Sequence, residues 1–396
     1  MKKVHPERSR RILVAMSGGV DSSVAAALLK KQGYLVVGAY MKNFSEESWK
    51  GVIKADCPWR QDLADARAVC ELLGIELRSF NFEKEYSEKV IEYFFAEYAA
   101  GRTPNPDIKC NKEIKFGLFL EKALGLGFDY IATGHYARIR KANAPQPPLK
   151  VRGGEGELCL LKGRDPQKDQ SYFLYTLTQN QLARTLFPIG KYTKLQVRAL
   201  ARKFGLPNAE KKDSQGVCFV GHINLREFLK QRIPERVGEI VTTSGQVIGS
   251  HHGAAYFTIG QREGIGIGGG SPYYVVQKDV IKNRVVVARK TLVPELAPPP
   301  KPGEGWVEGP PTLYSKSVMV KDIHWIGEKP KLPLKCSAKI RYQQEDQECA
   351  VFPSPGVGRV GERSLLVKFK IPQFAPAPGQ AVVFYDGEKV LGGGTI

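Results

Sequence analysis

A short glycine–serine segment near the start of the chain constrains the fold more than any other feature. Ser17–Ser23, with the sequence SGGVDSS, follows the apolar run Ile12–Met16 and leads into the helical pattern of Asp21–Gln32. Two glycines let a backbone turn tightly and approach a ligand, and the first amides of a helix point outward at its positive dipole end. The segment therefore predicts an anion site between a strand and a helix. It lacks the G-K-[ST] of a Walker A loop and the spacing of the dinucleotide-binding fingerprint.

The first two hundred residues alternate strand-like and helix-like patterns. Strand patterns recur at Tyr34–Met41, Glu76–Phe82 and Phe128–Thr133, and helical patterns at Arg60–Leu73, Glu88–Ala100, Thr178–Leu186 and Thr193–Phe204. The last of these begins with Thr193 and has Gln196 three residues on, which is a capping box. Alternation of this kind predicts an α/β fold with a doubly wound parallel sheet.

The composition changes along the chain and predicts three domains. Residues 1–222 are expected to form the catalytic domain, with an exposed insert at 141–157 that is rich in Pro, Gly and charge. Short strand patterns separated by glycines predict a small β-rich central domain at 223–295. A Pro-rich hinge follows, and residues 296–396 show only strand patterns, including a hairpin signal at Asp386-Gly387. We expect this last part to be an antiparallel β-barrel.

The chain is strongly basic, with 59 Lys and Arg against 40 Asp and Glu and a formal net charge of +19. Such an excess favours a polyanionic partner, because each phosphate that is neutralised releases a counterion. A merely solubilising surface is the alternative. The sequence has no apolar run of the roughly 20 residues that a membrane helix needs and no good signal peptide. We therefore expect a cytoplasmic protein without a membrane partner.

Seven cysteines are spread without C-x-x-C spacing, which disfavours a zinc ribbon or a disulfide scaffold. Four of them, Cys70, Cys159, Cys336 and Cys349, fall in helix or strand patterns, and Cys57 is ambiguous. Cys110 and Cys218 lie instead in segments read as turn-rich loops, with lysines nearby. Positive charge lowers a thiol pKa and favours the reactive thiolate. These two are the candidate reactive thiols.

SGGVDSS after a strand resembles the PP-loop of ATP pyrophosphatases. Further motifs extend the resemblance, over essentially the whole chain, to the bacterial-type tRNA 2-thiouridylase family. These motifs are Asn105–Lys112, Thr133–Arg138, Lys168–Tyr172, Gly216–Phe219, Tyr256–Arg262, Gly379–Tyr385 and Leu391–Gly394. The insert at 141–157 is longer than the family pattern leads us to expect.

The resemblance implies how ATP binds. The residues that would line its phosphates are Ala15, Met16, Ser17, Gly18, Gly19, Val20, Asp21 and Ser22. Met41 and Gly134 lie at the carboxyl ends of predicted strands, where open parallel sheets bind ligands, and would flank the adenosine. Mg²⁺ is expected to accompany the ATP. Asp21 is unusual in an anion site, and would hold a metal or polarise a neighbouring group.

The resemblance also implies a reaction. ATP adenylates the 2-oxygen of the wobble uridine, and Cys218 receives sulfur as a persulfide from a donor protein. The persulfide, or hydrosulfide released from it, attacks the 2-carbon and expels AMP. Cys110 would release the sulfur and leave a transient disulfide with Cys218. Asp107 would be the acid/base group, and Asn105, Pro106 and Asp107 would contact the extruded base.

Partners follow from the same resemblance. They are tRNAs with Lys, Glu and Gln-type anticodons, and a cysteine desulfurase or relay protein that supplies the persulfide. The residues expected to contact tRNA elsewhere are His135, Lys168, Asp169, Gln170, Arg341, Tyr342 and Gln380. Ordinary alternatives stay open: a hydrogen-bonded structural histidine, a charged first turn of a helix, and an exposed strand pair.

Three other accounts of these residues also stay open. Asp107, Cys110 and Cys218 could ligate an iron–sulfur cluster, although the usual spaced cysteine run is missing, which disfavours it. The chain could instead be a PP-loop ligase or amidating enzyme acting on a small metabolite. It could also be a non-catalytic RNA-binding protein that retains a vestigial nucleotide pocket.

Overall fold

The N-terminal part of the chain is built on a parallel sheet whose strand order is β3-β2-β1-β4-β7. A computed structural model describes residues 10–45, 59–142, 157–212, 224–289, 313–354 and 364–396. The strands are β1 (Arg11–Ala15), β2 (Leu35–Lys42), β3 (Leu77–Asn81), β4 (Tyr130–Ala132) and β7 (Thr185–Leu186). β1 is central because Ile12–Ala15 is apolar and is buried along its whole length. Within these ranges no helix is long and apolar enough to cross a membrane.

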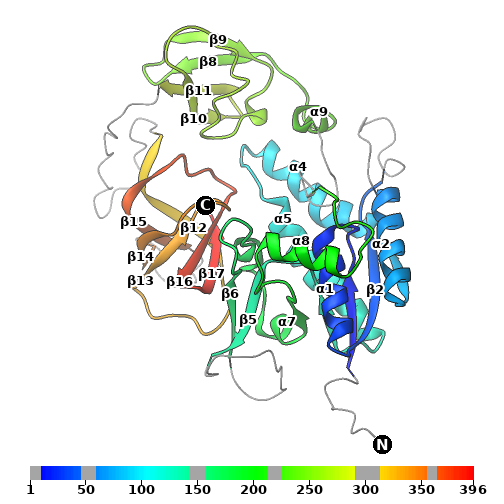
Figure 1. Cartoon of the computed structure of the whole chain (residues 1–396). Coiled ribbons are helices and arrows are strands. Elements are labelled where there is room, and N and C mark those ends of the chain that lie inside the picture. Colours follow the sequence, from blue (N-terminus) through cyan, green and yellow to red (C-terminus); the bar gives the residue numbers. More distant parts are fainter. Residues whose placement is uncertain (1–9, 46–58, 143–156, 213–223, 290–312, 355–363) are drawn as a thin grey trace, which may run out of the picture.

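Helices cover both faces of this sheet, so the predicted doubly wound α/β domain is confirmed (Figure 1). One face carries α1 (Val20–Lys31), α2 (Trp59–Leu73) and α8 (Lys194–Lys203). The other carries α3 (Glu83–Tyr86), a π-helical turn (Ser87–Ile91), α4 (Glu92–Ala99), α5 (Pro106–Cys110), a π-helical segment (Asn111–Leu118), α6 (Phe119–Gly125) and α7 (Gln179–Ala183). The strand order changes direction between β1 and β4, which is where such sheets bind ligands.

Two local predictions in this domain have different outcomes. The capping box of Thr193 and Gln196 is confirmed at the start of α8. The helix predicted over Thr178–Leu186 is too long, because α7 ends at Ala183 and Thr185–Leu186 forms the edge strand β7. β7 pairs with Ile131 and Ala132 of β4. A two-residue strand of this kind is set by its distant partner and has no local period of its own.

The central domain is a four-stranded sheet of order β10-β11-β8-β9, preceded by α9 (Leu225–Lys230). Its strands are β8 (Gly238–Thr242), β9 (Val247–His251), β10 (Tyr273–Asp279) and β11 (Arg284–Arg289). A separate small core includes Ile240, Phe257, Val275 and Val285. Figure 1 shows this domain above the other two.

The C-terminal domain is a closed antiparallel barrel, as the sequence predicted. Its strands are β12 (Tyr314–Trp325), β13 (Leu334–Lys339), β14 (Gln347–Pro353), β15 (Ser364–Phe374), β16 (Ala381–Asp386) and β17 (Lys389–Thr395). Pairing of β12 with β17 closes it. The hairpin predicted at Asp386-Gly387 is confirmed, since Asp386 pairs with Lys389.

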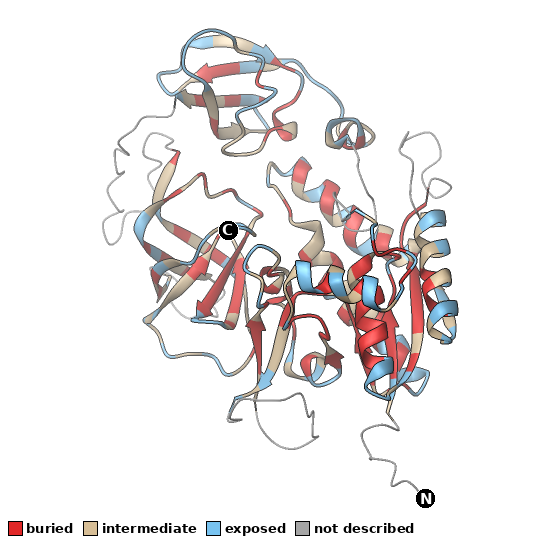
Figure 2. Cartoon of the chain, viewed as in Figure 1, coloured by how far each residue is buried: buried red, intermediate tan, exposed pale blue. Residues whose placement is uncertain are grey.

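The barrel is joined to the first domain by shared sheet structure. The hairpin of β5 (Ala137–Lys141) and β6 (Leu158–Lys162) extends the barrel sheet, because Lys389 pairs with Leu161. Most of the predicted insert, residues 143–156, lies outside the described part of the chain. Tyr172, fully buried, donates its hydroxyl to the carbonyl of Ala381 at 2.9 Å. Figure 2 shows buried residues running through the parallel sheet and into the barrel strands, so the two domains pack against each other.

Candidate functional site

The Ser17–Ser23 loop lies between β1 and α1, as predicted. Gly18 has φ +73, a backbone conformation that favours glycine. Gly19 is the N-cap of α1, and no described side chain caps the helix there. The hydroxyl oxygens of Ser17 and Ser22 are 3.2 Å apart, and the Ser22 hydroxyl donates to the carbonyl of Gly19 at 3.1 Å. Uncapped helix amides beside two hydroxyls fit the oxygens of a phosphate group.

Two glycines are required here by close packing of backbones. A Cβ on Gly18 would lie 2.3 Å from the carbonyl oxygen of Asp62 in α2. A Cβ on Gly134, in the loop after β4, would lie 2.7 Å from the amide nitrogen of Ser22. Gly134 therefore touches the first turn of α1, beside the phosphate loop. Met41 is buried next to the carboxyl end of β2, so both residues predicted to flank adenosine lie at this edge of the sheet.

Asp21 is held by two donors from distant parts of the chain. Lys194 Nζ donates to both carboxylate oxygens of Asp21, at 2.8 and 2.9 Å, and the Tyr136 hydroxyl donates to one of them at 2.8 Å. Local sequence reasoning missed Lys194 because it lies 173 residues from Asp21. A metal at Asp21 would have to displace this ion pair. The structure thus favours the other hypothesis, in which Asp21 orients neighbouring groups.

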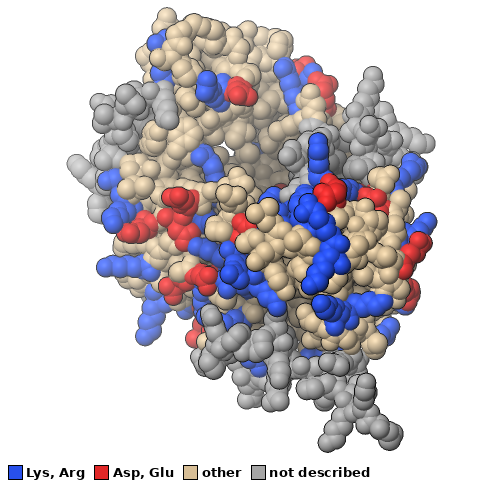
Figure 3. All heavy atoms as spheres, viewed as in Figure 1, with Lys and Arg blue, Asp and Glu red and all other residues tan. Residues whose placement is uncertain are grey.

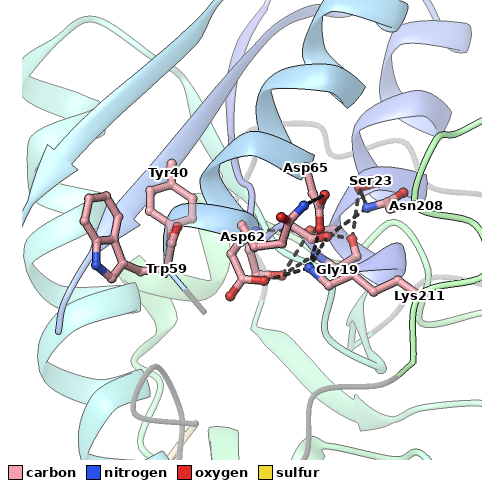
Figure 4. A network of polar contacts seen from close by, with 12 residues as sticks. Gly19, Ser23, Tyr40, Trp59, Asp62, Asp65, Asn208 and Lys211 are labelled. Carbon is pink, nitrogen blue, oxygen red and sulfur yellow. Dashed lines mark hydrogen bonds and ion pairs between the residues drawn. The ribbon is translucent and has the colours of Figure 1, made fainter. Parts of the chain in front are cut away.

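A second polar network holds the phosphate loop on the side that faces α2 (Figure 4). Asn208 donates to the carbonyl of Gly18 at 2.9 Å and to the Ser23 hydroxyl at 3.0 Å. Lys211 donates to Asp62 at 2.7 Å and to Asp65 at 2.5 Å. Burial opposes the charge of Lys211, but its hydrogen bonds to the two carboxylates outweigh this and raise its pKa. In the sequence, Lys211 was only one of the lysines near Cys218.

Positive charge gathers over α8, next to this loop. Figure 3 shows lysine and arginine side chains together on the face where α8 lies. α8 contributes Lys194, Arg198, Arg202 and Lys203. Positive charge on this face attracts anions such as phosphates.

Apart from His135, the residues predicted to contact tRNA lie near one another where the first domain meets the barrel; we call this place the junction. It comprises Asn105–Asp107, Lys168–Gln170, Arg341–Tyr342 and Gln380. The Tyr342 ring lies 4.5 Å from the ring of Phe173. Burial raises the pKa of Tyr342 to about 12, and the charges of Asp169, Asp165 and Asp107 add to the shift. Asp107 of the first domain is therefore electrostatically close to Tyr342 of the barrel.

Arg341 and Gln380 make contacts inside the protein. The Arg341 guanidinium donates to the carbonyl of Ala375 at 2.8 Å and lies over the ring of Phe374. Gln380 donates its side-chain amide to the carbonyl of Thr103 at 2.8 Å. Both side chains thus have protein partners, and their contacts with tRNA remain predictions.

The Lys168–Gln170 segment links the junction to the phosphate loop. Asp169 is buried, and its carboxylate accepts hydrogen bonds from the amides of Gly163 and Ser171. The amide of Gln170 donates to the carbonyl of Tyr136 at 2.9 Å, and the Gln170 side chain accepts from the amide of Tyr136 at 3.0 Å. Since the Tyr136 hydroxyl binds Asp21, a short series of contacts joins the two places.

Comparison with known proteins agrees with this arrangement. Residues 10–222 match the family described as the tRNA methyl transferase HUP domain, 226–289 its PRC-barrel domain, and 315–396 the aminomethyltransferase beta-barrel domain. A tRNA-specific 2-thiouridylase from Stutzerimonas stutzeri is 47% identical over 99% of this chain and 95% of its own length. One from Halalkalibacterium halodurans is 46% identical over 100% of this chain and 96% of its own length. The chain belongs to the tRNA-specific 2-thiouridylase family.

Cys110 of this family member is placed differently from our prediction. We expected a stiff loop, but Cys110 ends helix α5, which continues directly into the π-helical segment Asn111–Leu118. Pro106 is the first helical residue and Asn105 is the N-cap, with its side chain accepting from the amide of Ile108. Proline fits this first position because its missing N–H would have no partner there. π-Helical turns are rare and often occur at functional sites.

The surroundings of the Cys110 thiol also differ from the expectation. Cys110 is fully buried in the apolar cluster that contains Ile108, Ile114 and Phe116. Lys109, expected to supply positive charge, forms an ion pair with Glu113 at 3.0 Å. Glu113 therefore balances part of the positive charge of Lys109. The Cys110 thiol is therefore covered within the folded chain.

His135 lies in an apolar environment. It is only 8% exposed, its Nδ1 is 2.6 Å from the Thr133 hydroxyl, and its ring contacts those of Phe116 and Phe187. Burial, with a smaller effect of the Lys115 charge, lowers the pKa of His135 well below its ordinary value. The imidazole is neutral at pH 7. These contacts support the structural alternative for His135, and its tRNA contact remains a prediction.

The neutral His135 predicts a pH-dependent stability. Its pKa is lower in the folded chain than in the unfolded chain, so the unfolded state takes up the proton first as pH falls below about 6.5. We expect the free energy of unfolding to fall by up to about 1.4 kcal/mol per pH unit below that point, from this residue alone. Urea unfolding of wild type and His135→Gln between pH 7 and 5 measures the difference. Gln343→Asn, at an exposed position and without a titrating group, is the control and should keep the wild-type slope.

Several predicted features lie outside the described residues. Cys218 is among them, so its distance from Cys110 stays open, as does the iron–sulfur alternative that uses both. In the described part of the chain, no three His, Cys, Asp or Glu side chains are grouped to hold a metal ion.

Proposed function

We propose that this chain catalyses ATP-dependent 2-thiolation of the wobble uridine in tRNA. The observation that most supports this is the connection from the phosphate loop through Asp21, Tyr136 and Gln170 to the junction. A site that activates a base with ATP must place phosphates and base side by side, and these contacts couple the two places. The full-length relatives carry the name of this reaction. The net charge of +19 suits an RNA partner.

In the first step the 2-oxygen of the uridine attacks the α-phosphorus of ATP, and pyrophosphate leaves. The helix amides and hydroxyls at Ser17–Ser22 hold the phosphates, and Mg²⁺ enters only as the ion that accompanies ATP. Asn105, Pro106 and Asp107 contact the base after it is extruded from the anticodon stack. Asp107 takes up and returns the proton of the base. Adenylation turns a poor electrophile into one whose oxygen leaves as AMP.

In the second step sulfur replaces that oxygen. The terminal sulfur of a Cys218 persulfide attacks the 2-carbon, and AMP leaves with the oxygen. The Cys110 thiolate then attacks Cys218, breaks the sulfur–sulfur bond and leaves its electron pair on the thiolated base. Alternatively, Cys110 first releases hydrosulfide, which attacks the 2-carbon. Either route leaves a Cys110–Cys218 disulfide, which a dithiol reductant must return to two thiols.

The remaining expectations belong to the same proposal. The tRNA substrates have Lys, Glu and Gln-type anticodons, the persulfide comes from a cysteine desulfurase or a relay protein, and the reaction takes place in the cytoplasm. The proposed domains are 1–222, 223–295 and 296–396. Gln380, Arg341, Tyr342, His135 and Lys168–Gln170 are proposed to act at the tRNA interface, through contact or through support.

The formation of AMP and pyrophosphate tests this proposal. We expect both products only when tRNA is added. An Asp21→Ala variant should form them at least about 100-fold more slowly, because the change removes the carboxylate that Lys194 and Tyr136 bind beside the phosphates. Glu76→Ala, which removes an exposed carboxylate paired with Arg78 just before β3, is the matched control and should keep the rate. AMP release that is independent of tRNA would favour a small-metabolite ligase. No AMP under any condition would contradict an enzymatic role.

A further inference from the structure

The segment just before Asn105–Asp107 is held by the barrel, and we propose that Gln380 is a positioning residue for it. The Gln380 side-chain amide donates to the carbonyl of Thr103 at 2.8 Å and to that of Pro104 at 3.3 Å. These residues are 277 and 276 positions apart from Gln380 in the sequence. The inference rests on the proposed function for the role of Asn105–Asp107, and adds what keeps that segment in place.

The backbone around Gln380 makes the same attachment. The amide of Thr103 donates to the carbonyl of Pro378 at 2.7 Å. Gly379 has φ +92, and a Cβ on it would lie 2.8 Å from the Thr103 carbonyl oxygen. The turn is itself fixed, because Gly379 and Gln380 exchange backbone hydrogen bonds with Ile396 at 3.0 and 2.9 Å. A rigid part of the barrel therefore lies directly against Thr103.

The central domain reaches the same segment from another side. The Thr103 hydroxyl donates to the Thr258 hydroxyl at 3.4 Å. A Cβ on Gly101 would lie 3.1 Å from the side chain of Val280 in the turn after β10. A Cβ on Gly260, which lies near Thr258, would be 2.6 Å from the Cβ of Ala375 in the barrel domain. All three domains thus meet around Thr103.

Fixing Thr103 and Pro104 fixes the start of α5. The amides of Ala100, Gly101 and Arg102 still bond back to carbonyls of α4, so the connection that no helix holds is residues 103–105. Asn105 comes next and caps α5 through its bond from Ile108 at 3.2 Å. α5 carries Asp107 and Cys110. A displacement of about 1 Å in a reacting group can cost about 100-fold in rate, so an anchor at Thr103 acts on the chemistry through α5.

This role differs from the tRNA contact that the resemblance implies for Gln380. The amide nitrogen of Gln380 is directed at two backbone carbonyls of the first domain. Buried or half-buried carbonyls need a donor, and this amide supplies one for both. Loss of the donor should loosen residues 103–110 before any tRNA is present, whereas loss of a tRNA contact should not.

Hydrogen exchange of the tRNA-free full chain separates these roles. In Gln380→Ala we expect the amides of a peptide covering 103–118 to exchange at least about 10-fold faster than in wild type, because exchange reports local opening. Peptides from β1 and β4 should be unchanged. Single-turnover thiolation should slow by at least about 10-fold at saturating tRNA, while the Kd for tRNA changes by less than about 3-fold. Gln343→Ala, at an exposed barrel position, is the matched control.

Gln380→Glu gives a second test with nearly the same side-chain volume but no donor. It should repeat the faster exchange, which covers the case in which the alanine variant does not fold. A weaker tRNA Kd with wild-type exchange and wild-type saturated rate would overturn the proposal and make Gln380 a tRNA contact only. The exchange measurement needs neither tRNA nor turnover. If the wild-type chain failed to thiolate tRNA, the proposed function would fail while the exchange result still decided the anchoring role.

Discussion

A Cys110→Ser variant is expected to lose at least about 1,000-fold in tRNA thiolation while it still forms pyrophosphate in the presence of tRNA. A serine hydroxyl is almost fully protonated at neutral pH and does not open a sulfur–sulfur bond, so sulfur stays on Cys218. The phosphate loop and Asp21 are untouched by the change. Thiolated nucleoside and pyrophosphate, measured in the same reaction, give the two rates.

Cys159→Ser is the matched control for this result. Cys159 is also buried, in β6, and has no proposed chemical role. The Cys159→Ser variant should be somewhat less stable, because burial of a hydroxyl costs free energy. Its thiolation rate at saturating tRNA should stay within about 3-fold of wild type. Thiolation by Cys110→Ser at close to the wild-type rate would remove Cys110 from the reaction and leave its burial as its only role.

A Gly134→Ala variant is expected to lose at least about 100-fold in ATP-dependent AMP formation. The new Cβ would lie 2.7 Å from the amide nitrogen of Ser22 and 2.9 Å from the carbonyl carbon of Asp21. These are backbone atoms of the first turn of α1, so relief of the clash has to move the turn that would hold the phosphates. Overpacking of this kind also costs about 1–3 kcal/mol of stability. Pyrophosphate release and urea unfolding measure the two effects.

Gly125→Ala supplies the comparison for this variant. Gly125 ends α6, and a Cβ there meets nothing within 4 Å. Alanine also favours a helix over glycine by about 1 kcal/mol, so stability should hold or rise. Wild-type AMP formation by Gly134→Ala would mean that the loop after β4 can move away from α1 without harm. The nucleotide site would then lie elsewhere.

Features that depend on residues close together in the sequence were predicted well. The strand, glycine turn and helix around Ser17–Ser23 depend on neighbours along the chain, as do the capping box at Thr193 and the hairpin at Asp386-Gly387. The segment around Cys110 was misread although its signal is local. Asn105 followed by Pro106 is an N-cap and first-turn pair, and it begins a helix as readily as it interrupts one.

Contacts between distant segments could not be predicted from one sequence. Lys194 reaches Asp21 across 173 residues, and Gln380 reaches Thr103 across 277. The burial of His135 depends on Phe116 and Phe187, which come from other elements. Such side chains carry no local pattern that distinguishes a structural partner from a ligand contact. For this reason the list of candidate residues was predicted from the sequence, whereas their partners were seen only in the structure.

Analysis of anticodon nucleosides tests the central claim most directly. The full chain is incubated with unmodified tRNA, ATP and an isotopically labelled persulfide, and the digested tRNA is examined by mass spectrometry. We expect a 2-thiouridine that carries the label at the wobble position, dependent on ATP and formed together with AMP. Formation of AMP with no labelled sulfur in the tRNA, when donor and reductant are both present, would contradict the account.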